Sequence, residues 1–177
     1  MEKRFKKIPF LIILVFLIAG CQDNKSGIIL NTAYLPDQVV KNFSLDKYSL
    51  TEQQWNFHAS MADVYEKRGK IDAVNIIMKF YDKNSVSSVI SADKAAMDTN
   101  TGDVKAEGRV IMVSMLKGAT LYADSILYSS KTGKILSDSF IRQEKNDVVI
   151  TGRGLAAAAD LSEVTILKDV KVIKKLK

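Results

Sequence analysis

Apolar residues in most of this chain occur in short runs rich in Val, Ile and Tyr, and the spacing of an amphipathic helix is rare. Turn residues separate these runs about every 8 to 15 positions, which is typical of antiparallel strands joined by short connections. Six runs predict strands, at residues 74–81, 86–91, 108–115, 119–123, 148–151 and 164–172. The pattern therefore predicts an all-β domain built from antiparallel hairpins.

The connections between the runs contain Asn, Asp and Gly, which tolerate a positive φ or hydrogen-bond to their own backbone. We expect turns at residues 66–69, 82–85, 99–102, 131–133, 145–147 and 160–163. An Ala-Asp pair also recurs at 62–63, 92–93, 123–124 and 159–160, with separations of 30, 31 and 36 residues. A repeat of this length indicates stacked hairpins that bury their apolar faces against one another.

Alternation within two predicted strands indicates which side chains share a face. Val110 and Met112 lie on one face of their strand, and Leu121 and Ala123 lie on one face of the next. Residues 156–159 are all alanine, which could leave space inside the domain or allow close packing between strands.

The N-terminus has the pattern of an export signal. Four bases and one acid within residues 1–7 precede an apolar run at residues 8–20, which ends in Ile-Ala-Gly before Cys21. As a helix this run would span roughly 20 Å, short of the roughly 30 Å hydrocarbon core of a membrane, so a spanning helix is the weaker alternative. The segment Ile-Ala-Gly-Cys resembles a lipobox, where bacteria attach diacylglycerol, and further acyl chains such as palmitate, to the cysteine.

These features divide the chain into three parts. We expect a cleaved signal at 1–20, a lipid-attached Cys21 with a polar tether to residue 42, and one domain at 43–177. Several acyl chains on one cysteine would anchor the chain firmly to a membrane.

Charge and composition exclude several classes of function. The chain carries a net charge of +6, but residues 1–20 hold four bases and one acid, so the remainder has 22 bases, 19 acids and a charge of only +3. This balance does not suggest nucleic acid as a partner. A basic cluster near the C-terminus suits a solvated strand edge or contact with anionic lipid headgroups; it comprises Lys171, Lys174, Lys175 and Lys177.

The residues that catalysis or metal binding would need are largely missing. His58 is the only histidine and Cys21 the only cysteine, so no disulfide or His/Cys metal cluster can form, and the sequence shows no HExxH motif and no Ser-His-Asp set with a spare base. Gly152-Arg153-Gly154 resembles part of a phosphate loop but lacks a following helix, and strand glycines at a bend explain it better. We expect no catalytic residues, no metal and no cofactor, and we place His58 at the surface or an edge.

Several motifs in order resemble the LptC family of lipopolysaccharide export proteins. They comprise Leu-Pro-Asp-Gln at 35–38, Asn-Phe-Ser-Leu at 42–45, Trp-Asn-Phe-His-Ala at 55–59, Val-Ile-Ser-Ala-Asp-Lys-Ala at 89–95, Gly-Arg-Val at 108–110, Leu-Tyr-Ala-Asp at 121–124, Ile-Thr-Gly-Arg-Gly-Leu at 150–155 and Val170. Together they cover nearly the whole mature domain.

The resemblance implies an open, twisted β-jelly-roll with an apolar groove. Such proteins take lipopolysaccharide from an inner-membrane ABC transporter of the LptB-LptF-LptG type and pass it to a periplasmic bridge protein of the LptA type. Val110, Met112, Leu121 and Ala123 would line the groove, and Gly152 would lie where the family docks its partner chain. The groove would keep acyl chains out of water, at roughly 0.8 kcal/mol for each CH₂ group.

One departure from the family concerns the anchor. Many members keep a spanning helix, whereas Cys21 indicates a lipid anchor here. We expect this anchor in the inner membrane. The outer membrane stays an alternative, because Gln22 is not the acidic residue associated with inner-membrane retention. A second reading of the whole chain is a non-enzymatic scaffold with a filled core, which binds an envelope partner through its β-edges and carries no lipid.

Overall fold

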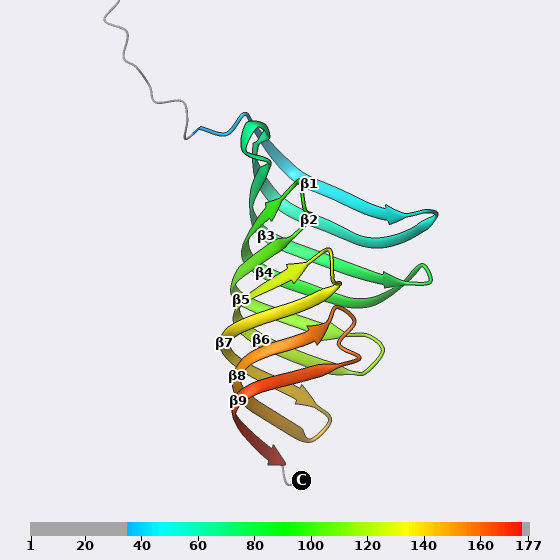
Figure 1. The fold of residues 1–177 in the computed structure, drawn as a ribbon, viewed down its shortest axis with the longest axis vertical. Coiled ribbons are helices and arrows are strands. Elements are labelled where there is room, and N and C mark those ends of the chain that lie inside the picture. The colour runs from blue at the N-terminus through cyan, green and yellow to red at the C-terminus, as the bar shows by residue number, and fades with distance from the viewer. Residues whose placement is uncertain (1–34, 175–177) are drawn as a thin grey trace, which may run out of the picture. The chain divides into compact units, whose positions relative to one another are not determined.

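The computed structural model describes residues 35–174, which form one sheet of nine antiparallel strands arranged in chain order (Figure 1). The strands are β1 (Gln38–Ser49), β2 (Glu52–Tyr65), β3 (Lys70–Asp82), β4 (Ser85–Asp98), β5 (Val104–Ser114), β6 (Ala119–Ser129), β7 (Lys134–Lys145), β8 (Val148–Ala158) and β9 (Val164–Lys174). A short 3-10 helix, η2 (Glu66–Arg68), joins β2 to β3. The predicted all-β class with antiparallel hairpins is confirmed.

The domain starts earlier than the sequence indicated. Strand β1 begins at Gln38, and the backbone N–H of Asp37 already donates to Val64 O at 2.8 Å, so residues 38–42 belong to the sheet rather than to the tether. The predicted signal at 1–20, the lipid site at Cys21 and the tether as far as residue 34 lie outside the described residues.

Each strand changes direction near its middle, and the interruptions line up across the sheet. Register shifts occur at Ser91/Lys94, Glu107/Val110, Ala123/Leu127, Ser137/Phe140 and Thr151/Arg153. Residues with positive φ accompany this line on several strands; they are Asn42, Asn75, Gly108, Arg109, Gly154 and Asp169. Because a bulge bends a strand and increases its twist, this row, which we call the bend line, folds the sheet over.

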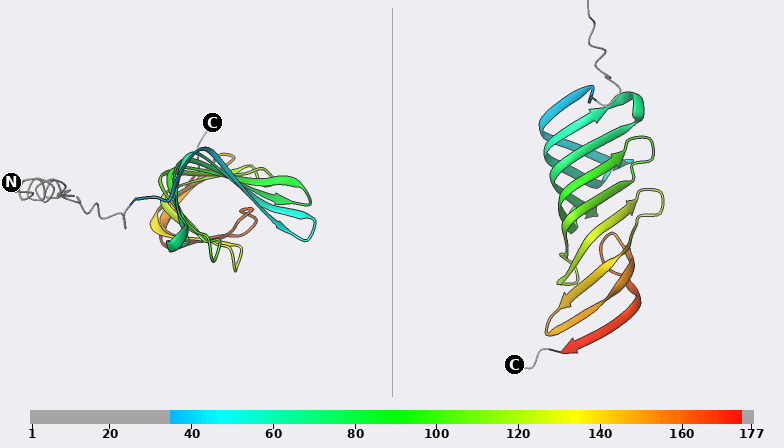
Figure 2. Two further views of the ribbon diagram at one scale, coloured as in Figure 1. Left: turned by 90° about the horizontal axis from the view of Figure 1, so that it is seen from above. Right: turned by 90° about the vertical axis from the view of Figure 1, so that its left-hand side faces the viewer.

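Folding at the bend line brings the two halves of the sheet face to face, as the end-on view of the ribbon shows (Figure 2). Buried apolar side chains from both halves form one cluster between them. Phe80 on β3 packs edge-to-face on Tyr128 of β6, with ring centroids 4.9 Å apart. Lys47 on β1 donates through Nζ to Ser130 Oγ beyond the end of β6. These contacts join strands that are not neighbours in the sheet. The fold is therefore the open β-jelly-roll that the resemblance implied.

The Ala-Asp pairs occupy different places in this fold. Asp93 and Asp124 lie at the bend line of β4 and β6, whereas Asp63 lies further along β2 and Asp160 lies in the β8–β9 turn. The repeating unit is thus the hairpin with its bend, and only two of the four pairs mark it.

Candidate functional site

The four residues expected to line a groove all face the interior at its centre. Val110 pairs with Ala123 and Met112 pairs with Leu121 across β5 and β6. Their exposed fractions are 1% for Val110, 0% for Met112 and Leu121, and 8% for Ala123, and all four belong to one apolar cluster. The interior at this level is filled by the protein's own side chains.

Open apolar space lies instead at the β1 end of the interior. A cavity of about 660 Å³ lies between the β1–β2 hairpin and the turn between β4 and β5, which is within the roughly 300–1,000 Å³ typical of ligand clefts. We call it the β1 mouth; its apolar lining is Val40, Phe43, Leu45, Trp55, Val64, Ile71 and Met97. Phe43 and Phe57 meet edge-to-face beside it, with centroids 6.3 Å apart.

Sequence reasoning missed the β1 mouth. Residues 38–42 were assigned to the tether, and β1 and β2 were not among the predicted strands. The motifs around Phe43 and Trp55 pointed to these segments, but only the folded sheet places them opposite the turn at Thr99–Gly102, about fifty residues later in the chain.

Polar groups stand at the rim of the β1 mouth. The Lys47 ammonium donates to Ser130 Oγ, and Ser130 N–H donates to Asp103 Oδ1 at 2.8 Å. Burial raises the pKa of the neighbouring Tyr128 hydroxyl, and its hydrogen bond with Ser130 opposes that rise. Asp46 accepts hydrogen bonds from Gln53 and Asn56. An apolar cavity with such a rim can hold a hydrocarbon chain while its polar end stays in water.

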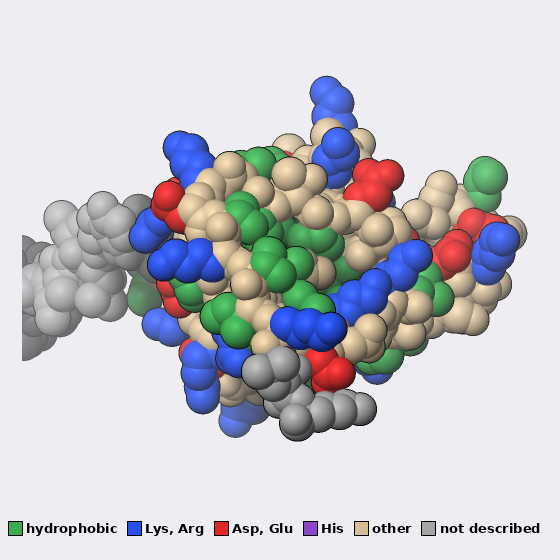
Figure 3. Space-filling model, turned by 90° about the horizontal axis from the view of Figure 1, so that it is seen from below, with side chains coloured by type: hydrophobic (Ala, Val, Ile, Leu, Met, Phe, Trp, Pro, Cys, Tyr) green, Lys and Arg blue, Asp and Glu red, His purple; other side chains and the backbone are tan. Residues whose placement is uncertain are grey.

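Strand β9 forms the opposite edge of the sheet and is apolar on its surface. The exposed apolar residues on this strand are Leu167, Val170, Val172 and Ile173. Viewed from that end, apolar side chains form a central patch with Lys and Arg side chains around it (Figure 3). The structure describes Lys171 and Lys174 of the C-terminal basic cluster, and both lie exposed on β9. Because β9 pairs with β8 alone within residues 35–174, one row of its backbone groups has no strand partner in this range and can bond a further strand.

Gly152, the residue expected to lie where a partner docks, is buried beneath β9. A Cβ at this position would lie 2.5 Å from Ile166 Cγ2 and 2.7 Å from Lys168 O. Any side chain at position 152 would therefore push β9 away from β8. Gly152 therefore determines how closely β9 lies against β8, and it is not part of the exposed surface.

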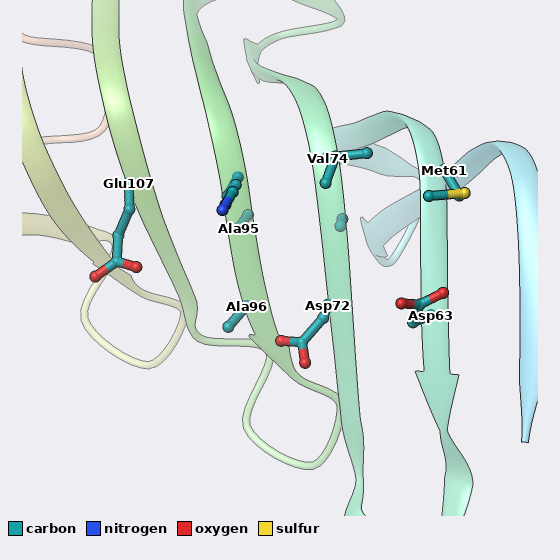
Figure 4. Close-up of a pocket in the computed structure, with 9 residues that line it drawn as sticks. Met61, Asp63, Asp72, Val74, Ala95, Ala96 and Glu107 are labelled. Carbon is teal, nitrogen blue, oxygen red and sulfur yellow. The ribbon is translucent and has the colours of Figure 1, made fainter. Parts of the chain in front are cut away.

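A smaller hollow of about 290 Å³ lies on the outer face of β2 to β5 (Figure 4). Its walls combine Met61 and Val74 with acidic side chains. Two of these acids are paired, Asp72 with Lys70 at 2.9 Å and Glu107 with Lys105 at 2.6 Å. The hollow is too small and too mixed in polarity to match the β1 mouth.

The described residues also bear on the expectations for His58, for metal binding and for a membrane-spanning helix. His58 is half-buried on β2, paired with Ser44 and Ile77. Within residues 35–174, no three His, Cys, Asp or Glu side chains are grouped closely enough to hold a metal ion. Nor does this part of the chain contain a helix with the length and apolar character that a membrane crossing requires.

The fold and its interior define a class: an open β-jelly-roll with an apolar cavity at one end and a free strand edge at the other. The family described as "Lipopolysaccharide-assembly, LptC-related" matches residues 11–174, and the chain belongs to this family. No curated protein sequence matches the chain.

A solved structure has a similar fold. It is the crystal structure of LptH from Pseudomonas aeruginosa, described as the LptA homologous periplasmic component of the conserved lipopolysaccharide transport device. The TM-score is 0.52 at 11% sequence identity, over 69% of this chain and 95% of that one. At this identity the similarity concerns the fold.

Proposed function

We propose that this chain is a lipid-anchored periplasmic carrier that receives lipopolysaccharide from an inner-membrane ABC transporter and passes it to a bridge protein of similar fold. The observation that carries the proposal is the β1 mouth, an apolar cavity of about 660 Å³ whose lining includes the core residues Trp55, Ile71 and Met97. Acyl chains would enter there, and the phosphorylated head would remain at the rim near Lys47. Membership of the LptC-related family supports the cargo.

The two free edges of the sheet suit a chain of such domains. In the described part of the chain, β1 and β9 each pair with one neighbour only, so each can add a strand from another protein by backbone hydrogen bonding. We assign β1 to the transporter side, because the mouth opens beside it, and β9 to the LptA-type bridge protein. Gly152 contributes by allowing β9 to lie close against β8. The chain itself would carry out no reaction, and the transporter would supply the energy.

The anchor in this proposal is diacylglycerol on Cys21 after removal of residues 1–20. The pattern of bases, apolar run and Ile-Ala-Gly-Cys supports it. The inner membrane is the proposed location, because the transporter partner lies there.

A second candidate is the scaffold without lipid cargo, and one observation favours it. Val110, Met112 and Leu121 have exposed fractions of 1% or less, as in an ordinary filled core. In that case the edges would bind envelope partners, and the β1 mouth would be covered by one of them.

Photocrosslinking in cells separates the two candidates. A photoreactive residue would replace Val40, Phe43 or Ile71 at the mouth, and Val110, Met112 or Leu121 at the centre. Arg109 and Lys131, which are exposed, serve as matched outer controls. The carrier predicts lipopolysaccharide adducts at the mouth and the centre only, and only while the transporter is active. Folded, anchored variants that give no adduct at any of these positions would establish the scaffold.

A further inference from the structure

The interior is closed over its centre by a turn, not by paired strands. The β8–β9 turn, residues 159–163, crosses from one half of the sheet to the ends of β4 and β5 in the other half. Ser88 Oγ donates to Ala159 O, and Ser114 Oγ donates to Asp160 O at 2.9 Å. Two successive carbonyl groups of the turn are thus held by two serines.

The two serines are placed side by side for this role. Ser88 on β4 and Ser114 on β5 are direct partners across the ladder, so their hydroxyl groups lie next to each other. They are almost fully buried, with exposed fractions of 0% and 1%, in a row of otherwise apolar inward side chains. A buried hydroxyl is stable only when it is hydrogen-bonded, and the turn supplies the acceptors.

Leu161 adds an apolar contact to these hydrogen bonds. It lies within a polar turn, yet its side chain is only 3% exposed and belongs to the apolar core cluster. Its φ is +57°, a conformation in which Leu is strained and Asn or Gly is usual. The burial of its side chain in the apolar interior therefore explains why Leu occupies this position despite the strained backbone.

The turn keeps its own shape without the serines. Leu161 N–H donates to Ala158 O at 2.9 Å, Ala158 N–H donates to Glu163 O at 3.0 Å, and Ser162 N–H donates to Asp160 Oδ1 at 2.9 Å. Moving the turn as a unit would break its contacts with Ser88 and Ser114 while leaving these bonds intact. Widening the interior through the sheet would instead break a ladder of backbone hydrogen bonds along a whole strand.

We propose that the β8–β9 turn is a displaceable latch, which closes the interior over Val110, Met112 and Leu121 and is released when the acyl chains of a lipid enter. The inference rests on the proposed carrier function, because only a cargo needs the space that Leu161 and its neighbours fill. A lipid chain that enters by the β1 mouth reaches a filled centre. Side-chain hydrogen bonds from Ser88 and Ser114 hold the latch to β4 and β5, and a backbone bond from Ala159 N–H to Gly133 O at 3.2 Å joins it to the turn between β6 and β7.

Hydrogen exchange on the full chain in detergent micelles tests the latch. Ser88→Ala with Ser114→Ala removes both donors, and the amides of residues 158–163 are expected to exchange at least tenfold faster. Ser87→Ala is the matched control, because Ser87 is buried beside Ser88 and its hydroxyl makes no hydrogen bond to the turn among the described residues. If the double variant does not fold, Leu161→Asn takes its place in the test. Asn suits the positive φ at this position but lacks the apolar side chain that fills the interior, so the same acceleration of exchange is expected.

Purified lipopolysaccharide is then added to the unsubstituted chain. Binding with faster exchange in residues 158–163 and slower exchange at the β1 mouth is the expected result. Binding that leaves the turn unchanged or protects it would overturn the latch and leave the carrier function standing. Lipopolysaccharide that changes exchange nowhere would remove the carrier function, and the latch with it.

Discussion

Arg109 on β5 holds the carboxylate of Asp93 on β4 at the bend line. Arg109 Nε donates to both carboxylate oxygens at 3.0 Å, and its second guanidinium nitrogen donates to Oδ1 at 2.7 Å. Gly108 leaves room for this pair, since a Cβ there would lie 2.8 Å from Asp93 Oδ2. The hydrogen bond from Arg109 holds the pKa of Asp93 below its ordinary value of 3.8. A charged pair thus joins two neighbouring strands at the place where both bend.

The first prediction concerns the acid titration of this pair. Because the folded state lowers the pKa of Asp93, the pair stabilises the fold above the unfolded pKa of about 3.9, and this contribution is lost as the pH falls through the folded pKa. Carboxyl-carbon NMR should show Asp93 titrating below its ordinary value. Arg109→Gln should raise that midpoint, and Lys94→Gln should raise it less, since Lys94 is a smaller cause. Equal midpoints in all three proteins would contradict the assignment.

The second prediction concerns the contact between the two halves of the sheet. Phe80→Ala removes a buried ring from the edge-to-face pair with Tyr128 and should lower the free energy of unfolding by roughly 3–5 kcal/mol. Urea unfolding measures the loss. Tyr128→Phe is the control, because it keeps the ring contact and removes only the hydroxyl. A loss for Phe80→Ala below that for Tyr128→Phe would show that the two halves do not depend on this contact.

The third prediction concerns Gly152. Gly152→Ala places a methyl group against Ile166 and the backbone of Lys168, and should cost roughly 1–3 kcal/mol through overpacking. Hydrogen exchange should become faster along β9, and binding to an LptA-type bridge protein should weaken.

Gly118→Ala provides the comparison for Gly152. Gly118 has a φ of +60° and open space around it, so alanine there strains the backbone by roughly 1–2 kcal/mol without touching β9. Bridge-protein binding should stay unchanged in this variant. If both variants weakened binding equally, general destabilisation rather than the position of β9 would be the cause.

The fourth prediction concerns the anchor. Cys21→Ser removes the thiol that would carry the lipid, so the chain should leave the membrane fraction or remain as an uncleaved precursor. Mass spectrometry of the unsubstituted chain should show an N-terminal cysteine with added acyl mass. A Cys21→Ser chain of full length that stays in the inner membrane and still supports transport would favour the spanning-helix alternative.

The sequence predicted those parts of the fold that local chemistry determines. The turns at 66–69, 82–85, 99–102, 131–133, 145–147 and 160–163 are present, because positive-φ residues such as Gly69, Asn84 and Asn146 make them locally favourable. The predicted strands were too short at several ends. The runs at 74–81 and 108–115 begin close to the bend residues Asn75 and Arg109, whereas β3 and β5 begin four residues earlier, at Lys70 and Val104.

Strands β1, β2 and β7 were not predicted, whereas the edge strand β9 was, at residues 164–172. β1 and the outer part of β7 are mostly exposed and polar, so neither shows a clear apolar alternation. The inward direction of Val110, Met112, Leu121 and Ala123 followed from alternation and agrees with their burial. The β1 mouth depends on how one half of the sheet is positioned over the other. No local sequence pattern predicts this relative position.

The order of the strands has a consequence for how the domain can assemble. Every strand from β1 to β9 pairs only with the strands directly before and after it in the chain. Hairpins form within microseconds, and folding is fast when contacting residues are close in sequence. A chain that grows from its N-terminus can therefore add one hairpin after another, without any strand waiting for a distant partner. The contact of Ser88 with Ala159, at a separation of 71 residues, can form only after β8 has been made.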